Sequence, residues 1–144
     1  MTVYGVTAGT FDLCHVGHIS FLNLCQEACD DLYVLVQVDP SKERPHKGKP
    51  VQSIFERFVQ IINLTAITSR NVYPYETEND LRNFIATFNE GDRIKLFVGE
   101  DHKNDVVTGS DLPGTEVVFI PRNHNYSSRE LKTRIFAQGL LKNV

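Results

Sequence analysis

The chain has 144 residues, of which 41% are hydrophobic and 23% charged, and its formal net charge is −3. This length suits one domain over 1–144, because domains most often contain about 100–150 residues, and the apolar fraction argues against disorder. The chain carries 15 Lys and Arg against 18 Asp and Glu, so a general nucleic-acid binder, which shows a basic excess, is disfavoured. We also expect no membrane partner, because no stretch approaches the roughly 20 apolar residues of a spanning helix.

The N-terminal segment MTVYGVTAGTFD lacks the basic region that opens a signal peptide. The cysteine count is three, an odd and low number that fits no disulfide framework. These two features predict a reduced, cytoplasmic protein.

Strand-like and helix-like patterns alternate along the chain. Residues 3–8 are rich in β-forming residues, and apolar residues at helical spacing predict a helix over 17–29. The apolar run 32–38 is typical of a strand buried on both faces of a parallel sheet. After a polar loop over 39–50, the segment Ser53–Glu56 has the capping-box pattern of a helix start. Five apolar side chains are expected on the buried face of that helix: Ile54, Phe55, Phe58, Ile61 and Ile62.

The second half continues the alternation. Thr77 is expected to cap a helix and Gly91 to end it, since glycine is common after a helix C-terminus, and a final helix is predicted over 128–138. This order implies an α/β fold, a Rossmann-like, doubly wound parallel sheet of five strands in a three-layer α/β/α sandwich. The remaining strands are predicted at 71–74, 94–98 and 116–120.

Ligands of such sheets bind outside the carboxyl ends of the strands. Four loops therefore deserve a search for functional residues: 8–18, 39–50, 99–109 and 121–128.

The first of these loops carries His15 and His18, which are three residues apart at a helix start and so lie on one face. Gly17 leaves room between them, and the helix N-terminus adds free N–H donors and a positive dipole end. This combination indicates a phosphate site. A surface histidine pair is the simpler alternative, and a zinc site that adds Cys14 and Cys25 is disfavoured because its spacing matches no usual zinc pattern.

The chain contains neither a P-loop nor a dinucleotide-binding fingerprint. Instead, GTFDLCHVGH resembles the signature of the HxGH nucleotidyltransferase superfamily, in the cytidylyltransferase form G-[TV]-F-D-x-x-H-x-G-H. The resemblance implies catalytic roles for His15 and His18 and a substrate contact for Asp12. It also implies nucleotide contacts for the remaining fixed positions, Gly9, Thr10, Phe11 and Gly17.

The loop KERPHKGK at 42–49 concentrates basic residues. It is either a solvated loop or a mobile lid that neutralises a triphosphate. Glycerol-3-phosphate cytidylyltransferases carry a lysine here, and KGKPVQSIFER is similar to a segment of bacterial heptose-phosphate adenylyltransferases. The resemblance implies that Lys47 is catalytic, that Lys49 binds nucleotide, and that Arg57 binds substrate, with a solvated helix charge as the alternative for Arg57.

The last loop resembles the second signature of the superfamily, R-T-x-G-I-S-T-[TS], at Arg122 and Ser127, whereas Asn123, Asn125, Tyr126 and Arg129 depart from it. Ser127–Ser128 also resembles the I-S-S-T of adenylyl-transferring relatives. Arg122 is expected to be catalytic, and the two serines to bind nucleotide at a helix N-terminus, although Ser127 is equally able simply to start the helix. Gly99 and Asp101 resemble the G-x-D element of the family and are expected to contact nucleotide, with a plain surface loop as the alternative.

These features predict a nucleotidyltransferase that moves CMP from CTP to a phosphorylated small alcohol such as glycerol 3-phosphate and releases pyrophosphate. The alternative is an adenylyltransferase that uses ATP on a sugar phosphate of the heptose type. An inactive nucleotide-binding module is the alternative of another class. Mg²⁺ is expected with the nucleotide rather than in a protein cage, and the resemblance implies a homodimer.

Overall fold

The structure is a computed structural model that describes residues 1–142. Its centre is a parallel sheet of five strands, β1 (Val3–Gly9), β2 (Asp31–Gln37), β3 (Val72–Tyr75), β4 (Arg93–Gly99) and β5 (Thr115–Ile120). The strand order is β3-β2-β1-β4-β5, with every neighbouring pair parallel. The predicted Rossmann-like α/β fold is therefore confirmed, and the only strand that contains proline, β3, lies at an edge, where a missing N–H is tolerated.

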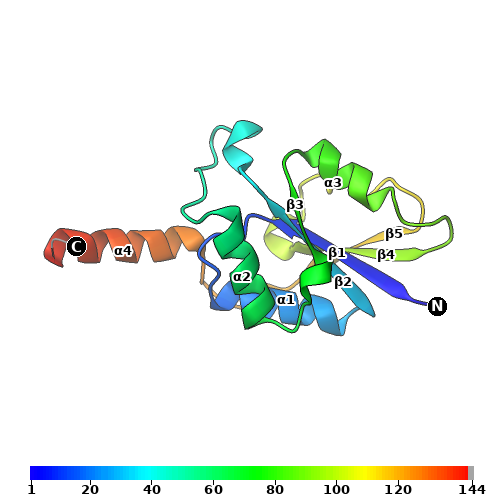
Figure 1. Ribbon diagram of the computed structural model, residues 1–144, viewed down its shortest axis with the longest axis horizontal. Helices are drawn as coiled ribbons and strands as arrows, with labels where there is room; N and C mark the ends of the chain where they lie inside the picture. Colours follow the sequence, from blue (N-terminus) through cyan, green and yellow to red (C-terminus); the bar gives the residue numbers. More distant parts are fainter. Residues whose placement is uncertain (143–144) are drawn as a thin grey trace.

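Helices cover both faces of the sheet (Figure 1). On one face α1 (Val16–Glu27) and α2 (Ile54–Leu64) contribute Leu22, Cys25 and Ile61 to a buried cluster. On the other face α3 (Glu78–Ile85) contributes Leu81 and Ile85 to a second cluster. Each cluster lies between the sheet and the helices on one of its faces. Burial of these apolar side chains is the main force that holds the layers of the sandwich together.

Helix α4 (Ser128–Lys142) behaves differently, because it extends away from the sheet (Figure 1). It is longer than the predicted 128–138, and its Ile135 and Phe136 are 57% and 69% exposed. Among the described residues, no helix combines the length and the apolar character that a membrane span requires.

Two local expectations are wrong. Phe55 is 74% exposed rather than part of the buried face of α2, because it is turned by about 100° from Ile54, which packs toward the sheet with Phe58 and Ile61. The helix α3 ends with Ala86 as its cap, and Gly91 lies in the turn before β4 with φ of 93°. Phe88, which follows α3, packs against Tyr4 with 5.0 Å between the ring centroids.

The order of the strands decides where a ligand can lie. From β1 the chain moves through β2 to β3 at one edge, and then returns to β4 on the other side of β1. Such a reversal separates the loops at the carboxyl ends of the two central strands and opens a crevice between them. The segment after β2 and the start of α4 lie at this end of the molecule, opposite the N-terminus (Figure 1).

Candidate active site

The loop between β1 and α1 has an unusual backbone. Phe11 and Leu13 have φ of 52° and 53°, in the left-handed region that residues with a Cβ rarely adopt. The Phe11 side chain is only 5% exposed, and its ring meets that of His18 edge-on with 5.4 Å between centroids. Phe11 therefore packs against the His18 ring. Gly9 lies close to the same phenyl ring, since a Cβ on Gly9 would be 3.1 Å from it.

His15 and His18 form the start of α1. Nδ1 of His15 accepts a hydrogen bond from the Gly17 N–H at 3.0 Å, and Nδ1 of His18 accepts from the His15 N–H at 3.3 Å. The two rings stack with 3.9 Å between their centroids. Because each Nδ1 is an acceptor, each neutral ring carries its proton on Nε2. The site thus has two fixed imidazole donors beside the positive end of a helix.

Burial keeps both rings neutral. It lowers the pKa of His18 to about 3, with a further contribution from the neighbouring His15. Burial also lowers the pKa of His15, and the nearby His124 and Arg122 lower it further. A phosphate would therefore meet two N–H donors rather than two fixed positive charges.

We expect His18 to stay neutral from pH 8 down to pH 5, because its folded-state pKa lies far below the value of about 6.5 for a free histidine. The unfolded chain binds this proton more readily, so the contribution of His18 to stability is complete above about pH 6.5 and is lost as the pH falls toward 3. Histidine ¹³C or ¹⁵N chemical shifts measured against pH check this, with the exposed His102 as internal control. A His18 resonance that titrates near pH 6.5 in the folded protein would contradict it.

Gly17 is the point where two loops meet. A Cβ placed there would lie 2.6 Å from Cε1 of His124 and 2.9 Å from Cε1 of His15. Only glycine leaves room for both rings, so its absent side chain brings the loop after β5 onto the start of α1.

Asp12 connects three segments and is 5% exposed. Its carboxylate accepts from the N–H groups of Val51 and Gln52 at 2.8 and 3.0 Å, and it lies 3.4 Å from Nζ of Lys132. Burial alone would raise the pKa of Asp12, but these hydrogen bonds and Lys132 outweigh burial and hold the pKa below its usual value. In this structure the carboxylate of Asp12 therefore connects the loops, and its substrate contact stays a prediction.

Arg57 is similarly enclosed, with 1% of its surface exposed. Its guanidinium donates to the carbonyls of Thr10 and Gln37 at 3.1 and 2.6 Å and to that of Val38 at 2.8 Å. Arg57 therefore joins the end of β1 to the end of β2 and is not a solvated helix charge, and its substrate contact stays a prediction.

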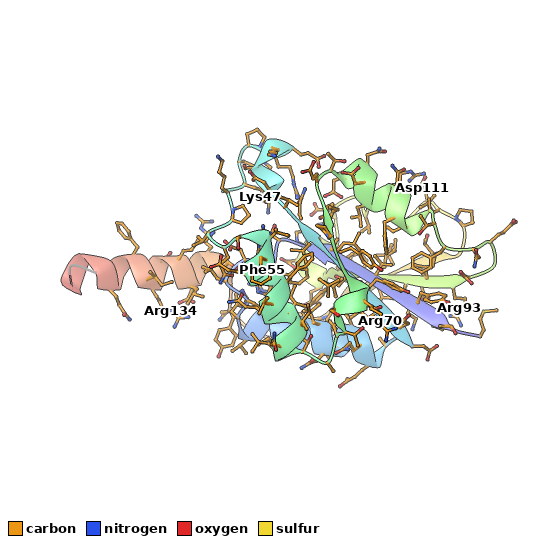
Figure 2. All side chains as sticks on the ribbon, in the orientation of Figure 1. Lys47, Phe55, Arg70, Arg93, Asp111 and Arg134 are labelled. Atoms are coloured by element: carbon orange, nitrogen blue, oxygen red, sulfur yellow. The ribbon has the colours of Figure 1, made fainter. Side chains whose placement is uncertain are left out.

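The basic residues of the loop after β2 do not all point to the same place. Arg44 turns toward α3, where it donates to Oε1 of Gln37 at 2.6 Å and lies 3.8 Å from Glu78. Lys47 and Lys49 are both exposed, and Figure 2 shows Lys47 on this loop. Lys49 is two residues before Val51, whose N–H is bound to Asp12, so the end of the loop that carries Lys49 is anchored beside the histidines.

The loops after β4 and β5 come together through Arg122. Its guanidinium lies 3.3 Å from Asp101 and donates to the Tyr126 carbonyl at 2.9 Å. Gly99 lies against the Asp101 carboxylate, since a Cβ on Gly99 would be 2.6 Å from Oδ1 of Asp101. The structure thus brings these three predicted residues together at the edge that also carries His15.

The two serines at the start of α4 have different partners. The Ser127 hydroxyl oxygen accepts from the Glu130 N–H at 3.0 Å, as predicted for a helix cap. The Ser128 hydroxyl donates to the Asp12 carbonyl at 2.7 Å. The start of α4 is thereby held against the loop between β1 and α1.

Sequence reasoning missed His124, Gln52 and Lys132. Gln52 accepts from the Leu13 N–H through Oε1 at 2.8 Å, and Lys132 reaches Asp12. Only His124 offered a signal, as a histidine in a loop already expected at the carboxyl edge. Within residues 1–142 no group of three or more His, Cys, Asp or Glu side chains could hold a metal ion.

Comparison with known proteins agrees with this geometry. Residues 6–134 match the model of a family described as cytidylyltransferase-like. The bifunctional protein HldE of Caulobacter sp. strain K31 is 34% identical over 141 residues, which are 94% of this chain but 28% of that protein. FAD synthase of Thermococcus sibiricus is 44% identical over 52 residues, 36% of this chain and 35% of that protein. The chain therefore spans about a third or less of the length of these relatives.

Solved structures show the same fold at low sequence identity. A bifunctional NMN adenylyltransferase/ADP ribose pyrophosphatase of Francisella tularensis has a TM-score of 0.66 and 14% identity, over 96% of this chain and 43% of that chain. A lipopolysaccharide core biosynthesis protein of Thermoplasma volcanium has a TM-score of 0.52 and 19% identity, over 96% of this chain and 90% of that chain.

Proposed function

Because the chain belongs to the cytidylyltransferase-like family of nucleotidyltransferases, we propose that it transfers AMP from ATP to a phosphorylated small molecule and releases pyrophosphate. The observation that carries this proposal is the pair of neutral histidines with both Nε2 protons directed by hydrogen bonds at Nδ1. These Nε2–H groups can donate hydrogen bonds to the triphosphate oxygens of a nucleotide and stabilise the negative charge that develops on those oxygens during transfer.

ATP is preferred to CTP on the strength of the relatives. HldE shares 34% identity over almost the whole chain, and the segment Lys47–Arg57 resembles that of heptose-phosphate adenylyltransferases. The name of FAD synthase denotes the formation of an adenine dinucleotide. These similarities support the adenylyl alternative better than CMP transfer to glycerol 3-phosphate.

In the proposed reaction a phosphate oxygen of the acceptor attacks the α-phosphorus in line, and the bond from this phosphorus to the pyrophosphate oxygen breaks. His15 and His18 donate hydrogen bonds to phosphoryl oxygens, and Arg122, Lys47 and Lys49 neutralise the charge of the leaving pyrophosphate. The chain contributes position and charge rather than a nucleophile. Magnesium supplies further charge neutralisation when it is bound to the nucleotide.

The finer roles of other residues are proposals as well. Gly9, Thr10 and Gly17 offer backbone groups to the nucleotide, and Asp101 reaches the nucleotide from the loop after β4.

We also propose a homodimer that forms through α4. Its Ile135 and Phe136 side chains are exposed, and a second copy would remove this apolar surface from water.

A panel of nucleotides and acceptors tests the proposed reaction. We expect ATP with a sugar phosphate to release pyrophosphate at a kcat/KM at least about tenfold above that of CTP with glycerol 3-phosphate, a difference of about 1.4 kcal/mol. Flavin mononucleotide serves as a third acceptor, reactions without acceptor give the background, and product masses identify the transferred group. Faster turnover with CTP would overturn the choice of base, and nucleotide binding without pyrophosphate release would favour an inactive binding module.

A further inference from the structure

The loop between β5 and α4 places a third histidine beside the pair at the start of α1. His124 is half-buried over Gly17, and its Cε1 atom occupies the space next to that of His15. It stands at the position that the second signature of the family leaves open. His124 is also close enough to the other two rings that its charge would lower the pKa of both.

The local hydrogen bonds hold the ring of His124. Nδ1 of His124 accepts from the Tyr126 N–H at 3.1 Å, so the neutral ring carries its proton on Nε2. The turn is closed from the other side by the Arg122 guanidinium, which donates to the Tyr126 carbonyl at 2.9 Å. His124 and Tyr126 also lie ring to ring, with 5.5 Å between centroids. The imidazole is thus fixed by its own loop and does not depend on ligand for its orientation.

All three histidines share one arrangement. In each, a backbone N–H binds Nδ1, which leaves Nε2–H as the donor of the neutral ring. Two of them come from the start of α1 and the third from the loop that precedes α4. A cluster of Nε2–H donors drawn from two elements can contact several oxygens of one polyanion.

We propose that His124 is a third phosphate-binding histidine, which donates through Nε2 to the β- or γ-phosphate of the nucleotide. This inference rests on the proposed function and extends it, because it assigns the polyphosphate tail to a residue that neither family signature specifies. The contact with the nucleotide forms in the ground state as well as during reaction, so loss of His124 should raise KM more than it lowers kcat.

Two substitutions separate donation from packing. His124→Asn retains a short side-chain acceptor for the Tyr126 N–H but loses the distant donor. His124→Gln retains an N–H donor near the position of Nε2. Arg82→Met is the control, because Arg82 lies on α3 and pairs with Asp111 in solvent.

The experiment measures binding of inorganic tripolyphosphate to the full chain by calorimetry, together with kcat and KM for ATP. A hydrogen bond to a charged group contributes about 1.5–3 kcal/mol, so we expect H124N to bind tripolyphosphate about tenfold or more weakly. H124Q should stay within about threefold of the unsubstituted protein, and R82M should match the unsubstituted protein. Equal binding by H124N and the unsubstituted protein would overturn the proposal, as would equal losses in H124N and H124Q or absence of tripolyphosphate binding by the unsubstituted protein.

The two proposals fail in different ways. Weaker tripolyphosphate binding by H124N without pyrophosphate release from any nucleotide would support the phosphate contact and overturn the proposed reaction. Normal turnover and normal tripolyphosphate binding by H124N would overturn the contact and leave adenylyl transfer standing.

Discussion

Replacing His18 by asparagine is expected to lower turnover about 10²–10³-fold while the protein remains folded. Nδ1 of His18 accepts from the His15 N–H and so helps to cap α1. The asparagine carbonyl can replace this acceptor, but the shorter side chain does not carry a donor to the position of Nε2. Loss of one donor that stabilises the charge of a transition state costs rates of this size.

Pyrophosphate release with saturating nucleotide and acceptor measures the effect of H18N, and thermal unfolding reports whether α1 is intact. His18→Ala removes the cap as well as the donor, so it should lose similar activity and more stability. The variant R82M serves as control because Arg82 pairs with Asp111 in solvent. Turnover by H18N within about threefold of the unsubstituted protein would contradict a role for this imidazole in the reaction.

Replacing Arg57 by methionine is expected to destabilise the protein by about 3–5 kcal/mol, since several buried carbonyls lose their donor at once. Methionine fills much of the same volume but carries no N–H. The carbonyls of Thr10, Gln37 and Val38 all bind this guanidinium at present. These carbonyls belong to the ends of β1 and β2, so the spacing of the two loops beside the site depends on the same contacts.

Urea unfolding of R57M, followed by circular dichroism, measures this loss. Arg57→Lys should recover only part of it, because one compact ammonium cannot reach carbonyls that a planar guanidinium spans. Arg82→Met is the matched surface control, since Arg82 pairs with Asp111 in solvent and exposed pairs contribute little. An R57M protein as stable as R82M would show that Arg57 is not a structural tie.

Local patterns were enough to place the main elements. The continuous apolar run of β2 is buried, and Ser53 caps α2 with Glu56 returning the bond. Such signals succeed because they depend on residues close together in the chain. The predictions of a buried Phe55 and of a helix end at Gly91 are wrong, because helical spacing alone does not say which face meets the sheet or where a turn begins.

Asp12 and Arg57 illustrate what local patterns could not predict. Both belong to segments with functional signatures, so each was expected to contact substrate. Their partners lie 39 to 47 residues away for the contacts with Val51 and Thr10, and no spacing rule relates such distant positions. Burial explains these contacts, because an enclosed charge must be paired with hydrogen-bonding groups of the protein.

The sequence by itself determined the family, the parallel sheet and the presence of a histidine pair at the start of a helix. These follow from residue types at short, fixed spacings, which act through the local backbone. Only the tertiary structure decided that Asp12 and Arg57 connect loops and that His124 joins the histidine pair over Gly17. These outcomes depend on how segments more than 100 residues apart, such as Gly17 and His124, pack at one edge of the sheet, and packing is a property of the whole fold.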